Sequence, residues 1–191
     1  MTSSFTPDII GNINNYLKTA NTLFSENYPG ESPERQPVHT VYGGAHIFKE
    51  DTAMKMGVSA INHIRTYVPN FVEFAKILEL KGHDLLPNSQ ADISDLEDYF
   101  ASESSEGKEE HGAYFAYTVY QRVLEKLSRE AVEDFRIDFE DGYGNRPDEE
   151  EDNHAISAAK EVAKGVASNS LPPFIGIRIK PLTEEQKNRA I

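Results

Sequence analysis

Residues 135–142 read FRIDFEDG and residues 174–180 read FIGIRIK, and these two stretches decide the fold class. Both are rich in β-branched and aromatic residues and stop at a turn residue, a pattern typical of strands. Between them, an acidic loop leads into a helical pattern that runs to about residue 167. The order strand, helix, strand predicts an α/β protein with a parallel sheet, either a barrel or a doubly wound sheet.

An earlier strand is predicted at residues 38–42 (VHTVY), where Gly43-Gly44 ends the run. Helical spacing follows it and continues, with breaks, through residues 69–130, which we interpret as a helical insertion. Three strands do not close a barrel, and the helix expected after Pro181 is still running at Ile191. We therefore expect the chain to be the N-terminal part of a longer protein.

Two regions are expected, which we place at residues 1–36 and residues 37–191. The first holds an amphipathic helix that starts near Pro7, and a proline-containing linker. The second holds the predicted strands and helices of the partial barrel. We found no internal repeat at a fixed period.

The composition excludes several classes of protein. The chain has 191 residues, with 19 Lys and Arg against 32 Asp and Glu, so its net charge is −13. This balance argues against a nucleic-acid partner or an anionic membrane surface, because both need clusters of basic residues. No apolar run approaches the roughly 18–20 residues of a membrane span. The absence of cysteine excludes thiolate zinc sites and fits a reducing compartment, so we expect a cytoplasmic protein.

The last predicted strand has one polar face. Its three isoleucines share one face, and Gly176, Arg178 and Lys180 share the other. A buried charge without a partner is strongly destabilising, by roughly 3–5 kcal/mol when a partner is removed. The polar face therefore requires acidic neighbours or an anionic ligand, and the planar guanidinium of Arg178 suits a carboxylate or a phosphate.

Acidic residues end the preceding strand, where Asp138 and Glu140 share a face and Asp141 follows. The carboxyl ends of parallel strands are where α/β folds place ligands and metals, and carboxylate oxygens there suit Mg²⁺. The alternative is an internal ion pair of Asp138 or Glu140 with Arg178 that holds the strands in register.

Two further patterns can be explained by structure without a ligand. Tyr42, Gly43 and Gly44 could present backbone N–H groups to an anion, or could make a tight strand-to-helix turn. Five consecutive acids at residues 148–152 are interpreted as a solvated helix start.

Residues 137–142 (IDFEDG), 177–180 (IRIK) and 38–44 (VHTVYGG) together resemble the citrate lyase β-subunit and malyl-CoA lyase family. That family belongs to the phosphoenolpyruvate/pyruvate superfamily of TIM barrels. The resemblance implies the first strands and helices of a (β/α)8 barrel. It also implies a Mg²⁺-dependent carbon–carbon lyase or aldolase that acts on small oxo acids or their CoA thioesters through an enolate.

The resemblance implies roles for the motif residues. Arg178 would be a catalytic residue that binds the substrate carboxylate or carbonyl, with Lys180 and the Tyr42–Gly44 turn also contacting substrate. Glu140 would be catalytic, and Asp138, Glu140 and Asp141 would lie around the waters of Mg²⁺. The family's direct metal ligands lie on later strands, so we expect them beyond residue 191. Lys180 stands where the family usually has Asn.

Other functions stay open. The family implies a homo-oligomer, and a malate-synthase-like condensation or phosphoryl transfer to an enol would use a similar site. The rival from another class is a non-catalytic α/β module that binds an anion or a partner through Arg178 and the glycine turn.

Overall fold

The computed structural model describes residues 5–102 and 107–191. The chain divides into two compact units, Met1–Gln36 and Pro37–Ile191. The first unit contains one helix, α1 (Pro7–Asn27), whose residues are all exposed. The Thr6 hydroxyl accepts the N–H of Ile9 at 3.4 Å, and Pro7 occupies the first helical turn. Both features favour a helix start at this position.

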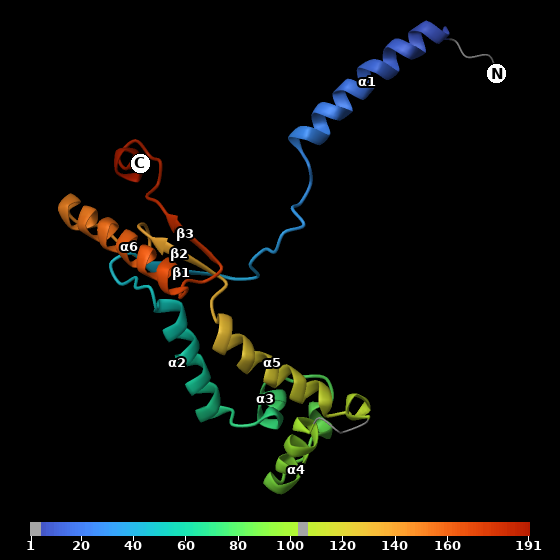
Figure 1. The fold of residues 1–191 in the computed structure, drawn as a ribbon, viewed down its shortest axis with the longest axis vertical. Coiled ribbons are helices and arrows are strands. Elements are labelled where there is room, and N and C mark those ends of the chain that lie inside the picture. The colour runs from blue at the N-terminus through green and yellow to red at the C-terminus, as the bar shows by residue number, and fades with distance from the viewer. Residues whose placement is uncertain (1–4, 103–106) are drawn as a thin grey trace. The chain divides into compact units, whose positions relative to one another are not determined.

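The second unit contains a small sheet whose strands are each followed in the chain by one or more helices (Figure 1). In chain order its elements are β1 (Thr40–Gly44), α2 (Thr52–Tyr67), α3 (Phe71–Ile77), η1 (His83–Leu85), α4 (Gln90–Ala101), η2 (Lys108–Glu110), α5 (Tyr114–Glu130), β2 (Asp134–Asp138), α6 (Asp148–Ser168), β3 (Phe174–Arg178) and α7 (Lys187–Ala190). The fold is therefore mixed α/β.

The three strands form one parallel sheet in the order β1-β2-β3. The register places Gly44, Asp138 and Arg178 in one row at the carboxyl ends of the strands. The predicted parallel arrangement of the strands is thus confirmed. The predicted site residues near this row come from neighbouring strands and lie at one edge of the sheet.

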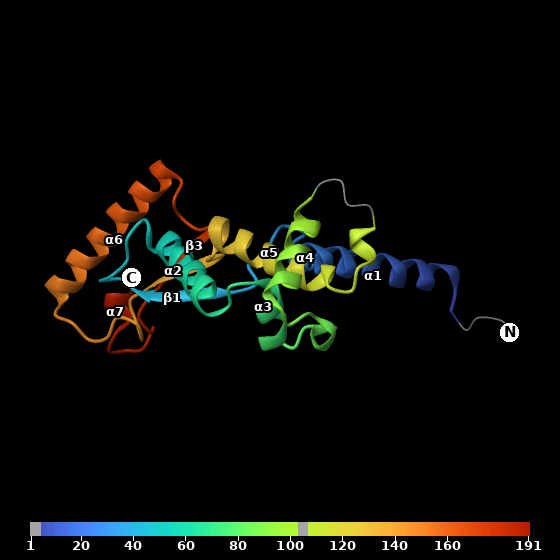
Figure 2. The same cartoon turned by 90° about the horizontal axis from the view of Figure 1, so that it is seen from below.

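One face of the sheet is apolar and is covered by helices. Phe135 and Ile137 of β2 are buried there, and they belong to a core that includes Ala53 of α2 and Ala158 of α6. Figure 2 shows both helices on the same side of the sheet. Side chains alternate along a strand, so Asp134, Arg136 and Asp138 lie on the opposite face.

The helices between β1 and β2 have a core of their own. Phe71 and Val72 of α3 are fully buried, and α5 contributes Ala116 and Tyr120. The Tyr120 hydroxyl donates to the backbone oxygen of Val68 at 3.2 Å, which satisfies the polar end of a buried ring. The described parts of the segment 69–130 are mainly helical, as predicted.

The prediction for the first strand was wrong in its bounds. β1 spans Thr40–Gly44, so Gly43 and Gly44 belong to the strand and do not terminate it. A Cβ atom on Gly43 would lie 2.6 Å from the Phe135 ring, and one on Gly44 would lie 2.3 Å from the backbone oxygen of Gly142. Close packing against neighbouring segments explains both glycines. β2 and β3 also end earlier than predicted, at Asp138 and Arg178.

Candidate functional site

Arg178 ends β3 and lies among three carboxylates. Its Nε is 2.6 Å from Glu140 Oε2, its Nη2 is 2.8 Å from Asp141 Oδ2, and its Nη1 is 3.6 Å from Asp138 Oδ2. The hydrogen bond that Arg178 donates to Asp141 and the charges of Asp141, Glu140 and Asp138 raise the pKa of Arg178. Three acids around one guanidinium leave two negative charges in excess at the edge of the sheet.

Asp138 organises the loop that carries the other two acids. Its side chain is 2% exposed, and its two oxygens accept the backbone N–H groups of Glu140 at 2.7 Å and Gly142 at 2.9 Å. Asp138 therefore fixes the turn after β2 and also contacts Arg178. This is the internal ion pair that the sequence left open as an alternative, here between residues that are neighbours in the register.

Of the three residues predicted to contact a ligand from the end of β1, Tyr42 lies near Arg178, whereas Gly43 and Gly44 pack against other segments. Tyr42 is 56% exposed, and the guanidinium carbon of Arg178 lies 5.5 Å from its ring centroid, within the range of a cation–π contact. Gly43 and Gly44 lie inside β1, where packing against Phe135 and Gly142 accounts for them. The backbone N–H after the glycine pair, that of Ala45, donates to the Asp138 carbonyl at 2.9 Å.

Lys180 forms an ion pair with a different acid, Glu151. Its Nζ lies 2.9 Å from Oε1 of Glu151 in α6, and both side chains are nearly buried, at 11% and 8% exposed. The other oxygen of Glu151 receives Nε and Nη2 of Arg189 at 3.1 and 2.9 Å. The acidic run 148–152 is therefore not a wholly solvated helix start, because Glu151 faces inward and is paired with two cations.

A small cavity joins Lys180 to the Arg178 cluster. It has a volume of about 330 Å³, and its lining includes Lys180, Glu140, Asp141 and Asn145. Glu140 and Asp141 are two of the acids that bind Arg178. The cavity therefore lies directly beyond the carboxyl ends of β2 and β3, where α/β proteins bind their ligands.

A cluster that the sequence did not predict surrounds Tyr143, in the loop between β2 and α6. The Tyr143 side chain is buried, and its hydroxyl lies 2.7 Å from Nδ1 of His154. The Arg146 guanidinium lies 4.7 Å from the centroid of the ring, and Lys180 Nζ lies 5.8 Å from it. Its place next to Gly142, in the loop that follows an acidic strand end, was the available signal.

His46, which follows β1, completes this cluster. Its ring centroid lies 5.6 Å from that of Tyr143 and 6.1 Å from that of His154. Burial, and then the positive charge of Arg146 and the neighbouring His154, lower the pKa of His46, and Glu150 opposes the shift. Its Nδ1 is buried with no hydrogen-bond partner in the part of the chain that the structure describes. The ring is therefore favoured in its neutral form.

The three acids around Arg178 differ in whether their carboxylate oxygens are available to a metal ion or to its bound waters. Glu140 is 28% exposed and Asp141 is 78% exposed, so their oxygens can reach metal-bound waters, whereas both oxygens of Asp138 already accept backbone N–H groups. Within residues 5–102 and 107–191, no three His, Asp or Glu side chains are arranged as direct metal ligands. Glu140 and Asp141 could therefore reach the waters of a bound Mg²⁺, which is the role that the family resemblance implies for them.

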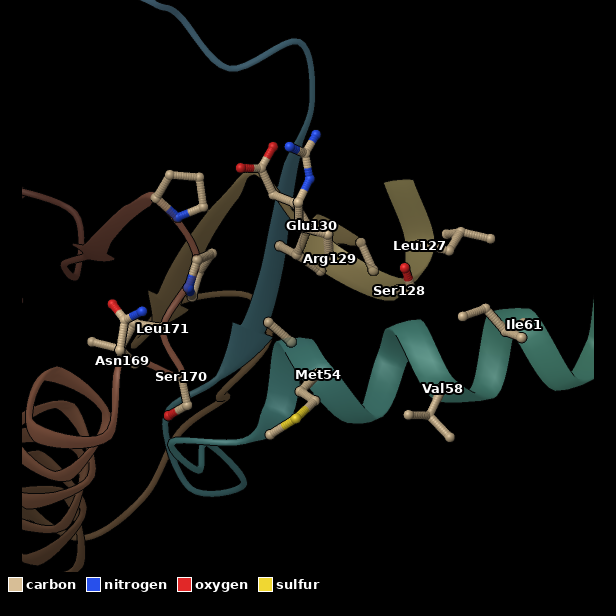
Figure 3. A pocket seen from close by; sticks show the side chains of 15 residues that line it. Met54, Val58, Ile61, Leu127, Ser128, Arg129, Glu130, Asn169, Ser170 and Leu171 are labelled. Carbon is tan, nitrogen blue, oxygen red and sulfur yellow. The ribbon is translucent and has the colours of Figure 1, made fainter. Parts of the chain in front are cut away.

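A larger cavity of about 500 Å³ opens at the other end of the strands (Figure 3). It is lined by Met54 and Val58 of α2, by the segment 127–132 that leads into β2, and by the segment 169–173 that leads into β3. These segments precede the strands, so the cavity lies away from Arg178. None of the predicted site residues lines it.

The chain belongs to the family described as a domain of unknown function, DUF6986, whose family model matches residues 17–191. No match was found among curated proteins or among solved structures. In the part of the chain that the structure describes, no helix is long and apolar enough to cross a membrane.

Proposed function

We propose that this chain forms the first part of a (β/α)8 barrel enzyme that makes or breaks carbon–carbon bonds in small oxo acids or their CoA thioesters. The sequential parallel order β1-β2-β3, with α2 and α6 packed on one face, supports this arrangement. In a barrel, the opposite face, which carries Arg136 and Asp138, would be the interior. Active sites of such barrels lie at the carboxyl ends of the strands.

The main support for the proposal is that Arg178 lies in register with Gly44 and Asp138 at the carboxyl ends of the strands. Its side chain is 34% exposed, and its guanidinium is held in place by Glu140 and by the exposed Asp141. A substrate carboxylate would replace Asp141 at Nη2 and accept the same charge-assisted hydrogen bond there. Arg178 would then bind and orient the oxo acid, while Asp138 and Glu140 keep the guanidinium in its position.

A carbonyl next to the bond that breaks must accept negative charge as an enolate forms, and Mg²⁺ supplies that stabilisation when it is bound. Glu140 and Asp141 would hold waters around the ion, and the excess of two negative charges at this edge suits a divalent cation. The positive charge of Arg178 on the same side favours the anionic form of the substrate.

A second candidate function is a non-catalytic module that binds an anion through Arg178. One observation favours it: the Arg178 guanidinium already binds carboxylate oxygens, of which those of Asp141 are exposed and replaceable, and binding of an anion in their place requires no metal ion. In this case, an oxo acid would bind and would not be cleaved.

The test uses the product of the complete gene, with 4-hydroxy-2-oxopentanoate and malyl-CoA as substrates and pyruvate as a binding probe. We expect cleavage that depends on Mg²⁺ and stops with EDTA. The Arg178→Ala variant should bind pyruvate about tenfold more weakly or worse, since it loses the cation that contacts the carboxylate. The matched control is Arg136→Ala, on the same sheet face but paired with Asp134, with folding checked by circular dichroism.

The outcomes separate the candidates. Cleavage lost in Arg178→Ala and kept in Arg136→Ala supports the enzyme. Pyruvate binding that needs Arg178, without cleavage of either substrate, supports the binding module. Equal behaviour of the two variants removes Arg178 from any ligand site and leaves it as a structural ion pair.

A further inference from the structure

The helical insertion has a cavity of its own, with a volume of about 650 Å³. It is lined by η1, α4, η2 and the start of α5, which lie away from the three strands (Figure 1). The apolar core beneath it is separate from the core of the sheet. Pockets that bind ligands typically have volumes of about 300–1,000 Å³, so this cavity is large enough to receive several side chains of a partner.

The lining of the cavity combines core residues with exposed apolar side chains. Leu86 and Ala113 are 6% and 4% exposed and belong to the core of the insertion. Leu85 and Phe115 also line the cavity, but they are 85% and 53% exposed. Large apolar side chains that gather at a cavity and remain in contact with water mark an interaction surface.

Hydrogen bonds hold the segments that line the cavity. Lys76 Nζ donates to the backbone oxygen of Pro87 at 3.2 Å and to Oδ1 of Asn88 at 2.7 Å, which fixes the chain between η1 and α4. On the other side, Nδ1 of His111 accepts the backbone N–H of Ala113 at 3.1 Å. A cavity with fixed walls loses little conformational entropy when a partner binds.

The surroundings of the cavity are acidic. Glu109 and Glu110 line it, and both are exposed. Between residues 79 and 112 the sequence has ten Asp and Glu residues, two Lys and no Arg. One of these lysines, Lys108, is bound to two backbone oxygens near the end of α4, and the other, Lys81, lines the cavity. The charge around this apolar cavity is therefore complementary to a basic partner.

The secondary structure around the cavity favours a partner that is helical. The described residues of the segment 69–130 form helices and turns and no strand, so they offer no strand edge to which an extended peptide could add. An amphipathic helix needs no such edge. It can place the apolar side chains of one face in a cavity and keep charged residues beside that face for the rim.

We propose that this cavity binds a basic amphipathic helix of a partner protein. The apolar face of that helix would cover Leu85 and Phe115, and its Lys and Arg residues would meet Glu109 and Glu110. The inference is independent of the reaction proposed above, because the cavity shares no residue with the cluster around Arg178. The insertion would then be a protein-binding site carried by the α/β domain.

The test measures the binding of fluorescently labelled peptides to the product of the complete gene by fluorescence anisotropy. The probe LKKLLKLLKKLLKL has leucines on one face and lysines on the other when it is helical. Its isomer LKLKLKLLKLKLKL has the same composition and the period of a strand. We expect the helical probe to bind about tenfold more tightly than the isomer, and a peptide with Glu in place of each Lys should not bind.

Two double variants test the charge. Glu109→Lys combined with Glu110→Lys should weaken binding of the helical probe about tenfold or more, because like charges then meet at the rim. The matched control combines Glu184→Lys with Glu185→Lys, at exposed positions outside the insertion, and changes the net charge equally. At about 150 mM salt, where charges more than about 8 Å apart are largely screened, the control should change the dissociation constant less than about twofold.

Two single variants test the apolar contact. Phe115→Gln should weaken binding of the helical probe about fivefold or more, because it removes exposed apolar surface from the lining. The control Ile77→Gln, at a position of α3 that is 61% exposed and outside the lining, should leave binding unchanged. Circular dichroism and thermal unfolding check that each variant is folded. Leu85→Gln, at a position 85% exposed, tests the same contact without touching a long helix.

Several results would overturn the inference. Equal weakening in the two double variants would mean a general attraction to an acidic protein. Equal binding of the two Leu–Lys isomers would exclude a helical partner. Binding that is unchanged in both Phe115→Gln and Leu85→Gln would place the peptide elsewhere. A dimer in analytical ultracentrifugation that dissociates in Phe115→Gln would assign the cavity to a second copy of this chain.

Discussion

Asp138 and Arg178 face each other across β2 and β3, as partners in the register, with Oδ2 and Nη1 3.6 Å apart. The shorter contacts of Asp138 are to the backbone, at Glu140 and Gly142. Asp138 thus positions the loop after β2, and that loop supplies Glu140 and Asp141 to Arg178. The fully buried acid is a positioning residue, and the exposed acids are those that a ligand can displace.

Replacing Asp138 should destabilise the protein more than replacing its exposed neighbour. In Asp138→Ala, two backbone N–H groups lose their acceptor and Arg178 loses a buried partner, so we expect a loss of about 3 kcal/mol in the free energy of unfolding. The control Asp141→Ala removes an ion pair of a side chain that is 78% exposed, and it should change stability by less than about 1 kcal/mol. Urea unfolding followed by circular dichroism measures both. Equal losses would contradict the role of Asp138 in the loop.

Gly44 should not tolerate a methyl group. A Cβ at this position would lie 2.3 Å from the Gly142 backbone oxygen, and backbone cannot move aside as a flexible side chain can. We expect Gly44→Ala to lose about 1–3 kcal/mol of stability. Gly112→Ala serves as the control, because no atom lies within 4 Å of its added Cβ, and it should stay within about 0.5 kcal/mol of the wild type. Wild-type stability in Gly44→Ala would show that β1 and the loop after β2 are further apart.

His46 should make stability depend on pH below neutrality. Its pKa is lowered in the folded protein, so the unfolded chain takes up a proton first as the pH falls below the ordinary value of about 6.5. The unfolded state is then favoured, and the free energy of unfolding decreases until the folded protein is also protonated. The stability advantage of the wild type over His46→Gln should therefore shrink between pH 7 and pH 5.

The control for this pH effect is His63→Gln, at an exposed position of α2. Urea unfolding of the three proteins at both pH values gives the comparison, and the carboxylates that also titrate in this range are common to all of them. A difference between wild type and His46→Gln that stays constant or grows toward pH 5 would contradict the lowered pKa.

Much of the fold could be predicted from local pattern. The alternation in residues 135–142 and 174–180 predicted two strands with polar and apolar faces, and the sheet confirms their parallel order. Apolar spacing predicted helices in the segment 69–130, and Pro7 predicted the start of α1. These features depend on a period of two or of 3.6 residues, which the sequence carries directly.

The site was less predictable, because its contacts join residues that are distant in sequence. Lys180 was expected beside Arg178 by strand alternation, but β3 ends at Arg178 and the chain then turns toward Glu151. Glu151 itself looked like one of five equivalent acids, and only the packing of α6 distinguishes the inward one.

The sequence by itself determined the α/β class, the acidic character and the presence of carboxylates and arginine at the ends of two adjacent strands. Only the tertiary structure decided which acid meets which cation, and that Gly43 and Gly44 serve close packing. It also brought His46 and His154 together around Tyr143, although more than a hundred positions in the chain separate the two histidines. The periodicity of a strand reflects residues that are near neighbours in the chain. Burial and ion pairing depend instead on contacts between distant residues, which form only when the whole domain is folded.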